Sequence, residues 1–144
     1  MSEANTWKYL KTCIGPQWEA QRHENLTGSG VADVSFSLKH QNFRGNGWIE
    51  LKYADAWPRR EATILRIRHF TDEQRRWLYK RYERGGGAYV FIQVGREFML
   101  FTGVEMLLLG RKNKTWMLDN CCGYWYNRIN PTDFLKTIID NWTN

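Results

Sequence analysis

The chain has 144 residues, of which 42% are hydrophobic and 15% aromatic, which is enough apolar material for one core and for a single domain over residues 1–144. The sequence shows no low-complexity tract, no signal peptide and no apolar run near membrane-spanning length, so we expect no membrane partner. Its three cysteines, two of them adjacent, give no disulfide framework. We therefore expect a cytoplasmic protein of a bacterial or phage-infected cell. The formal net charge of +6 and the sequence pI near 9.4 indicate an anionic partner.

The first half of the chain predicts two strands joined by a loop. Residues 31–38 and 48–53 are mostly apolar, β-branched or aromatic, with charges interposed in the second run. Residues 39–47 between them are polar and contain two glycines, so we expect a long hairpin loop there. Ahead of these strands, residues 17–24 are a candidate helix.

The register expected for this hairpin brings charged residues together. A loop centred on the 42–43 bond places Asp33 opposite Lys52 on the neighbouring strand. Side chains alternate along a strand, so Glu50 and Lys52 share one face, which we expect to lie over an open cleft while the apolar residues beside them turn to the core. An acid, a spacer and a lysine on one strand face is also a common surface pattern, and the strand alone leaves both interpretations open.

The second half of the chain predicts the remainder of an α/β architecture. Thr71 and Gln74 form a capping-box pattern at the start of a helix that ends at Gly85. Asn130 and Pro131 begin a C-terminal helix. The other expected elements are strands over residues 63–69, 88–94 and 98–102, a short helix over 104–109 and a basic loop over 111–114. We therefore expect a mixed central β-sheet flanked by α-helices.

The acids and the lysine near the first two strands suit a hard cation and a phosphate. Hydrolysis of a phosphodiester needs two or three carboxylates that hold a divalent cation beside the phosphate, with one cationic side chain near the attacking water. Carboxylate and carbonyl oxygens favour Mg²⁺ or Mn²⁺. Zinc is not expected, because His23, His40 and His69 are scattered and no paired cysteine spacing occurs.

Four sequence motifs together resemble those of a known nuclease superfamily. They are Gly30-Val31-Ala32-Asp33, Trp48-Ile49-Glu50-Leu51-Lys52, Phe70-Thr71-Asp72-Glu73-Gln74-Arg75-Arg76-Trp77 and Gly86-Gly87-Ala88-Tyr89-Val90. The combination, within about residues 22–102, resembles the PD-(D/E)xK nucleases, and among them the virus-type replication-repair nuclease (VRR-NUC) branch and the phage Holliday-junction resolvases. Ala32 stands where the family often has a proline, which shapes the backbone and binds no metal. The resemblance implies a restriction-endonuclease-like core.

The resemblance also implies a role for each matching residue. Asp33 and Glu50 would be the carboxylates that bind Mg²⁺ or Mn²⁺, and the carbonyl of Leu51 would be a further ligand. Lys52 would position or polarise the attacking water.

A third acid and a glutamine complete the catalytic set that the resemblance implies. The family usually places an acid on its first helix, and Glu24 is the candidate for that catalytic and metal-binding residue, with Glu19 as the alternative. Gln74 would reach back toward the site from the helix that follows the core strands.

The arginines around these motifs are candidates for DNA contacts. Arg59 and Arg60 follow a Trp-Pro turn, and Arg75 and Arg76 belong to the helix that starts at Thr71. A solvated basic helix face is the alternative for the last two.

We expect an Mg²⁺-dependent endonuclease that acts on branched or double-stranded DNA, with resolution of Holliday junctions as the favoured activity. Paired incision across a junction implies a homodimer, for which the aromatic residues Trp116, Tyr124, Trp125 and Tyr126 are interface candidates. A general or restriction-type phage nuclease and a DNA-binding module without catalysis are the alternatives.

Overall fold

A single sheet of six strands, in the order β1-β2-β3-β4-β5-β6, lies at the centre of the molecule. In the computed structural model, which describes residues 2–23 and 30–142, neighbouring strands run antiparallel except β3 and β4, which run parallel. The strands are β1 (Trp18–Arg22), β2 (Val34–His40), β3 (Phe43–Ala54), β4 (Gly87–Val94), β5 (Glu97–Phe101) and β6 (Gly123–Tyr126). A parallel pair needs a crossover connection, and helix α2 (Asp72–Glu83) lies in the connection between β3 and β4.

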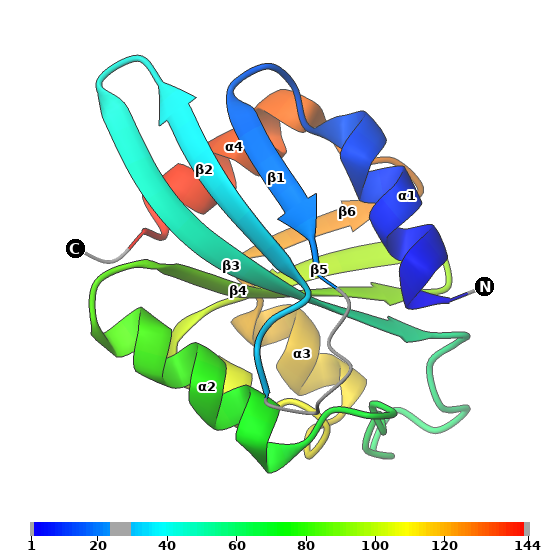
Figure 1. Cartoon of the computed structure of the whole chain (residues 1–144). Coiled ribbons are helices and arrows are strands. Elements are labelled where there is room, and N and C mark those ends of the chain that lie inside the picture. Colours follow the sequence, from blue (N-terminus) through cyan, green and yellow to red (C-terminus); the bar gives the residue numbers. More distant parts are fainter. Residues whose placement is uncertain (1, 24–29, 143–144) are drawn as a thin grey trace.

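Helices cover both faces of this sheet (Figure 1). Helices α1 (Glu3–Cys13) and α4 (Pro131–Asp140) pack on one face, while α2, the 3-10 helix η1 (Gly103–Leu108) and α3 (Lys114–Asn120) pack on the other. The expected mixed sheet flanked by helices is therefore confirmed. Across residues 2–23 and 30–142, no helix is long and apolar enough to cross a membrane.

Two apolar layers separate the sheet from its helices. The alternation of β3 sends Ile49 and Leu51 into the layer under α1 and α4, as expected. The same alternation sends Glu50 and Lys52 to the opposite face, which carries the layer under α2, η1 and α3. Buried residues of the first layer include Trp7, Leu10, Phe36, Phe91, Phe134 and Ile138, and those of the second include Leu78, Val90, Ile92, Met99, Met106 and Met117.

The expected long loop over residues 39–47 is wrong, because β2 and β3 form a tight hairpin. His40 pairs with Phe43, which leaves a two-residue turn, and Gln41 adopts a φ of 53° in the left-handed region. Pairing continues to Val34 opposite Ile49. The expected pair of Asp33 with Lys52 is therefore shifted by two positions, and Asp33 lies level with Glu50.

Strand β1 corrects a second expectation, since its residues pair antiparallel with β2 instead of forming a helix over 17–24. Residues 63–69 are also not a strand and contain only an isolated bridge from Ile64 to Asn113. The helices that begin after Thr71 and Asn130, the short helix near residue 104 and the two strands β4 and β5 are confirmed. Helices α1 and α3 and strand β6 were not expected.

Candidate active site

Asp33 and Glu50 are held side by side just before β2 begins at Val34. Strand β3 pairs with β2 only as far as Ile49, so its last residues pair with β4 alone and leave space for the chain that leads into β2. The backbone N–H of Asp33 donates to Glu50 Oε1 at 3.1 Å, and the N–H of Leu51 donates to Asp33 Oδ2 at 2.9 Å. Each carboxylate thus accepts a backbone N–H from the segment that carries the other acid, which keeps the two carboxylates adjacent.

Lys52 is buried beside these carboxylates. Its side chain is only 2% exposed, and Nζ donates to the carbonyl oxygen of His69 at 2.9 Å. The same nitrogen lies 3.4 Å from Glu50 Oε2 and 3.9 Å from Glu3 Oε1. His69 has a φ of 58°, a left-handed conformation at the position whose carbonyl receives the ammonium. The face with Glu50 and Lys52, which we expected to be open, is therefore closed around the lysine.

Glu3 is a third acid that sequence reasoning missed. It begins α1, whose first turn is capped by Ser2, and its side chain is about one-third exposed. Burial raises the pKa of Glu3, and the charge of Asp33 raises it further, while Lys52 lowers it. The helix was recognisable from Ser2 with the apolar spacing of Trp7 and Leu10, but nothing in the sequence gave its place over β3.

Glu50 has a raised pKa and a buried carboxylate oxygen that accepts no hydrogen bond from the part of the chain that the structure describes. Burial raises its pKa to about 8, the charge of Asp33 adds to that rise, and Lys52 opposes it. Among the described residues, Oε2 of Glu50 is the buried side-chain oxygen that accepts no hydrogen bond. A buried oxygen beside a second carboxylate suits a divalent cation, whose charge would replace the proton. The residues present therefore fit Mg²⁺ or Mn²⁺.

Within residues 2–23 and 30–142, no three His, Cys, Asp or Glu side chains gather as a ready-made metal-binding group. Asp33 and Glu50 are the two carboxylates in direct register, and Glu3 approaches them through Lys52. The roles of Leu51 as a carbonyl ligand and of Lys52 toward water stay predictions. Glu24 lies outside the described residues.

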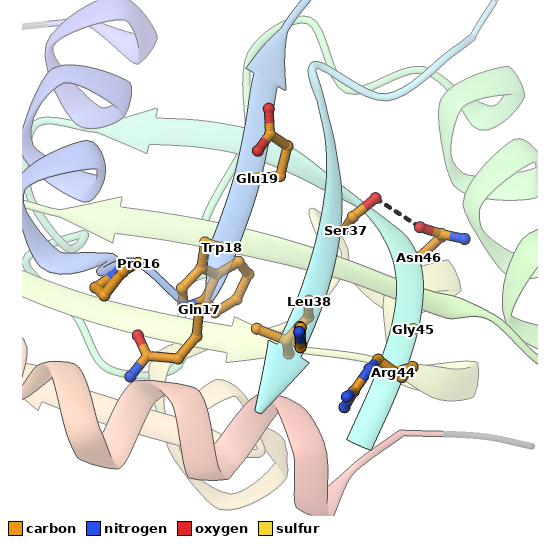
Figure 2. Close-up of a pocket in the computed structure, with 10 residues that line it drawn as sticks. Pro16, Gln17, Trp18, Glu19, Ser37, Leu38, Arg44, Gly45 and Asn46 are labelled. Atoms are coloured by element: carbon orange, nitrogen blue, oxygen red, sulfur yellow. Dashed lines mark hydrogen bonds between the residues drawn. The ribbon is translucent and has the colours of Figure 1, made fainter. Parts of the chain in front are cut away.

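Glu19 does not reach this cluster. It pairs with Ser37 on β2, four positions along the ladder from Asp33, which is about 13 Å at the rise of a strand. It lines instead an open hollow of about 440 Å³ on β1, β2 and β3, where Ser37 Oγ donates to Asn46 Oδ1 at 2.6 Å (Figure 2). Glu19 is therefore not the third acid of this site.

Gln74 caps the helix that borders the site. Its Oε1 accepts the N–H of Thr71 at 3.0 Å, and Thr71 Oγ1 accepts the N–H of Gln74, which completes the expected capping box. The residues just before this helix, His69 and Phe70, contact Lys52. The side-chain oxygen of Gln74 is thus used in starting α2, and its reach toward the carboxylates stays a prediction.

Arg75 does not lie at the surface, in contrast to our expectation for a DNA contact. It is 8% exposed, and its guanidinium donates to the carbonyl oxygens of Phe70 and Leu109. Burial lowers its pKa. Arg75 thus ties α2 to the segment after η1. Arg59, Arg60 and Arg76 are exposed, the first two in the segment between β3 and α2.

No family model matches this chain, and no curated protein or solved structure matches it significantly.

Proposed function

We propose that the protein is a metal-dependent DNA endonuclease with a restriction-endonuclease-like core, and that branched DNA such as a Holliday junction is its substrate. The observation that carries the proposal is the interlocked pair of Asp33 and Glu50 with Lys52 buried against it. The choice of branched DNA rests on the resemblance of the motifs alone.

Asp33 and Glu50 would hold the cation, with the carbonyl of Leu51 and the carboxylate of Glu3 as further oxygens. Glu3 takes the place that the resemblance gives to an acid on the first helix. A bound Mg²⁺ or Mn²⁺ supplies positive charge at the phosphate and makes water more acidic. Burial raises the pKa of Glu50 to about 8, so a bound cation would promote loss of the proton from this carboxyl.

Lys52 orients the water. Its ammonium has three N–H donors, of which one is fixed on the carbonyl of His69 at 2.9 Å. The same nitrogen lies 3.4 Å from Glu50 Oε2, so a further N–H of the ammonium would donate to a water at the edge of the carboxylates. That water forms a new bond to phosphorus, the bond to the leaving ester oxygen breaks, and the proton lost by the water passes to solvent while the leaving oxygen is protonated.

The charges of the chain favour DNA over a neutral substrate. The net charge is +6, and Arg59, Arg60 and Arg76 are exposed. Two adjacent carboxylates repel phosphate unless a cation lies between them, so a module that only binds DNA has no use for them. This supports catalysis over simple binding. A general phage nuclease would use the same residues and differs only in the DNA that it cuts.

Cleavage of a labelled four-way junction beside matched duplex and flap DNA tests the proposal. We expect paired nicks on the junction with Mg²⁺ and a loss of at least about 100-fold in Asp33→Asn and Glu50→Ala. Glu19→Ala, an exposed acid outside the cluster, is the matched control and should cut normally.

Each other outcome has a definite meaning. Cutting of duplex or flap with the junction spared keeps the nuclease and removes the resolvase. Full activity in folded Asp33→Asn and Glu50→Ala variants refutes the assignment of the site. Binding of DNA without cutting in any metal favours the inactive module.

A further inference from the structure

A second open hollow, of about 560 Å³, has among its lining residues Tyr53, which follows Lys52 in the chain. It is formed by the end of β3 with the segment that follows, and by residues 63–66 and 68. Arg68, which also lines it, precedes His69, whose carbonyl binds the Lys52 ammonium. The lining of the hollow therefore includes the chain neighbours of Lys52 and of His69.

The lining combines aromatic rings with guanidinium groups. Tyr53 and Trp57 contribute rings, Arg66 and Arg68 contribute exposed cations, and Asp55 is the one carboxylate in this lining. Two cations against one anion leave a net positive charge. The hollow thus offers flat apolar surface and cationic donors side by side, next to a site suited to phosphate.

Trp57 gives the hollow a fixed wall. Its Nε1 donates to the carboxylate of Glu97 on β5, and Lys114 Nζ lies 5.4 Å from the ring centroid. These contacts fix the position of the indole within the protein itself. Leu65, which also lines the hollow, is buried, and its N–H donates to the carbonyl of Lys112. Because the walls are fixed by other elements, the hollow exists before anything binds.

We propose that this hollow binds one unpaired nucleotide of the DNA, next to the phosphate that is cut. The inference rests on the proposed function. A nucleotide presents a flat ring for Tyr53 and Trp57 and a phosphate for Arg66 and Arg68. A paired base has both faces covered by its neighbours, so it enters only after it leaves the stack.

Selectivity for branched DNA follows from this geometry. Taking a base out of an intact duplex costs free energy, and that cost is smallest where the base is already unpaired. A branch point or a bulge supplies such a base beside a scissile phosphate. The hollow would therefore favour DNA whose pairing is interrupted at the cut, with no need to recognise a particular sequence.

Binding of two fluorescent DNA molecules, measured in Ca²⁺, tests the inference without requiring cleavage. One is a duplex with a single bulged 2-aminopurine, and the other is the same duplex fully paired. We expect the wild type to prefer the bulged DNA and to change the 2-aminopurine emission on binding. In the double variant Arg66→Ala/Arg68→Ala, affinity for the bulged DNA should fall roughly 10-fold, with a smaller loss for the paired DNA.

The double variant Lys11→Ala/Lys136→Ala is the matched control, since it removes the same charge from exposed lysines of α1 and α4. It should keep the preference for the bulge. Equal losses for both DNA molecules in the two double variants would mean general electrostatics and would overturn the inference. Tyr53→Ala, which keeps all charges of the lining, should lose the emission change, and an unaltered signal would also count against the hollow.

The inference and the proposed function fail separately. A bulge preference that depends on Arg66 and Arg68 supports the hollow even if no DNA is cut. Cleavage that needs Asp33 and Glu50, together with an unchanged bulge preference in Arg66→Ala/Arg68→Ala, removes the hollow and keeps the nuclease.

Discussion

Glu50 is the residue at which the proposed chemistry and the expected pH dependence of folding meet. It is 1% exposed, adjoins Asp33 and contacts Lys52, and burial raises its pKa to about 8. A raised pKa favours the protonated carboxyl, so cation binding at the proposed site would release a proton from Glu50.

The pH dependence of folding should reveal this carboxyl. Its pKa is higher in the folded chain than the ordinary 4.5, so its stabilising contribution is complete below about pH 4.5 and is lost as the pH rises through about 8. Urea unfolding without metal should show this loss, at most about 1.4 kcal/mol per pH unit. Glu50→Gln should flatten the curve, and Mg²⁺ should restore the stability of the wild type at alkaline pH. A wild-type curve parallel to that of Glu50→Gln would contradict the raised pKa.

Glu3 offers a second test at this scale. If its carboxylate is the third acid, Glu3→Gln should weaken Mg²⁺ binding roughly 10-fold in calorimetry while the fold is retained. Asp119→Asn removes an exposed acid of α3 and is the control. Equal Mg²⁺ affinity in both variants would exclude Glu3 from the cation site and leave it as a partner of Lys52 only.

At the scale of elements, Trp142, just after helix α4, adds a close contact with the sheet to those of the buried side chains of the helix. A Cβ added to Gly87 would lie 2.4 Å from the Trp142 ring, and one added to Gly45 would lie 2.6 Å from it. The absence of a Cβ at these glycines of β3 and β4 thus leaves the space that the indole of Trp142 occupies. A Cβ at the neighbouring Gly86 would meet atoms only at 3.7 Å or more, which is ordinary contact.

This contrast predicts different effects of two neighbouring substitutions. Gly87→Ala should destabilise the protein by about 1–3 kcal/mol, because the new Cβ would overlap the Trp142 ring and displace it. Gly86→Ala should have little effect. Chemical denaturation of both variants provides the comparison. Equal stability of the two variants would show that the indole moves without cost.

Elements also show where local sequence is a good guide and where it is not. The start of α2 was predictable because Thr71 and Gln74 satisfy each other's backbone within four residues. Strand β1 was not, because residues 18–22 include good helix formers and only their pairing with β2 makes them a strand. The glycines at 45 and 47 indicated a loop, yet they lie in β3 under aromatic rings.

The central residues of the candidate site, Asp33, Glu50 and Lys52, could be named from the sequence, but their contacts could not. Alternation along β3 correctly put Glu50 and Lys52 on one face. The partner of Asp33 depended on the turn, and the left-handed conformation of Gln41 has no clear signature in the sequence. Glu3 precedes Asp33 by 30 residues and approaches the site only through tertiary packing. The burial of Arg75 likewise depends on its contact with the segment that follows η1.

At the scale of the whole molecule, paired incision requires two copies of the chain on one junction. The interface candidates divide in the structure, since Trp125 is buried with its Nε1 donating to Asp133, while Tyr124 and Tyr126 are exposed on the edge strand β6. Trp116 is half-buried and stacks on Phe101, so Tyr124 and Tyr126 are the most accessible of the four candidates.

Sedimentation with a four-way junction checks this arrangement. We expect two chains per junction and a loss of the second chain in Tyr126→Glu, which places charge on the edge of the sheet. A single chain per junction in the wild type, even at saturation, would make paired resolution untenable, whereas cleavage of one strand at a time would remain open.

The tight turn after β2 lies at the opposite end of the hairpin from Asp33 and Glu50, so the length of the hairpin can change without changing the contact between these two residues. Register is set from Val34 opposite Ile49 to His40 opposite Phe43, and the acids follow at the far end of the ladder. Residues can therefore be added or removed near Gln41 in pairs, one on each strand, without turning Glu50 or Lys52 to the other face. A single added residue has no such freedom unless a bulge absorbs it. Hairpins that differ in length by even numbers of residues can thus keep Asp33 level with Glu50.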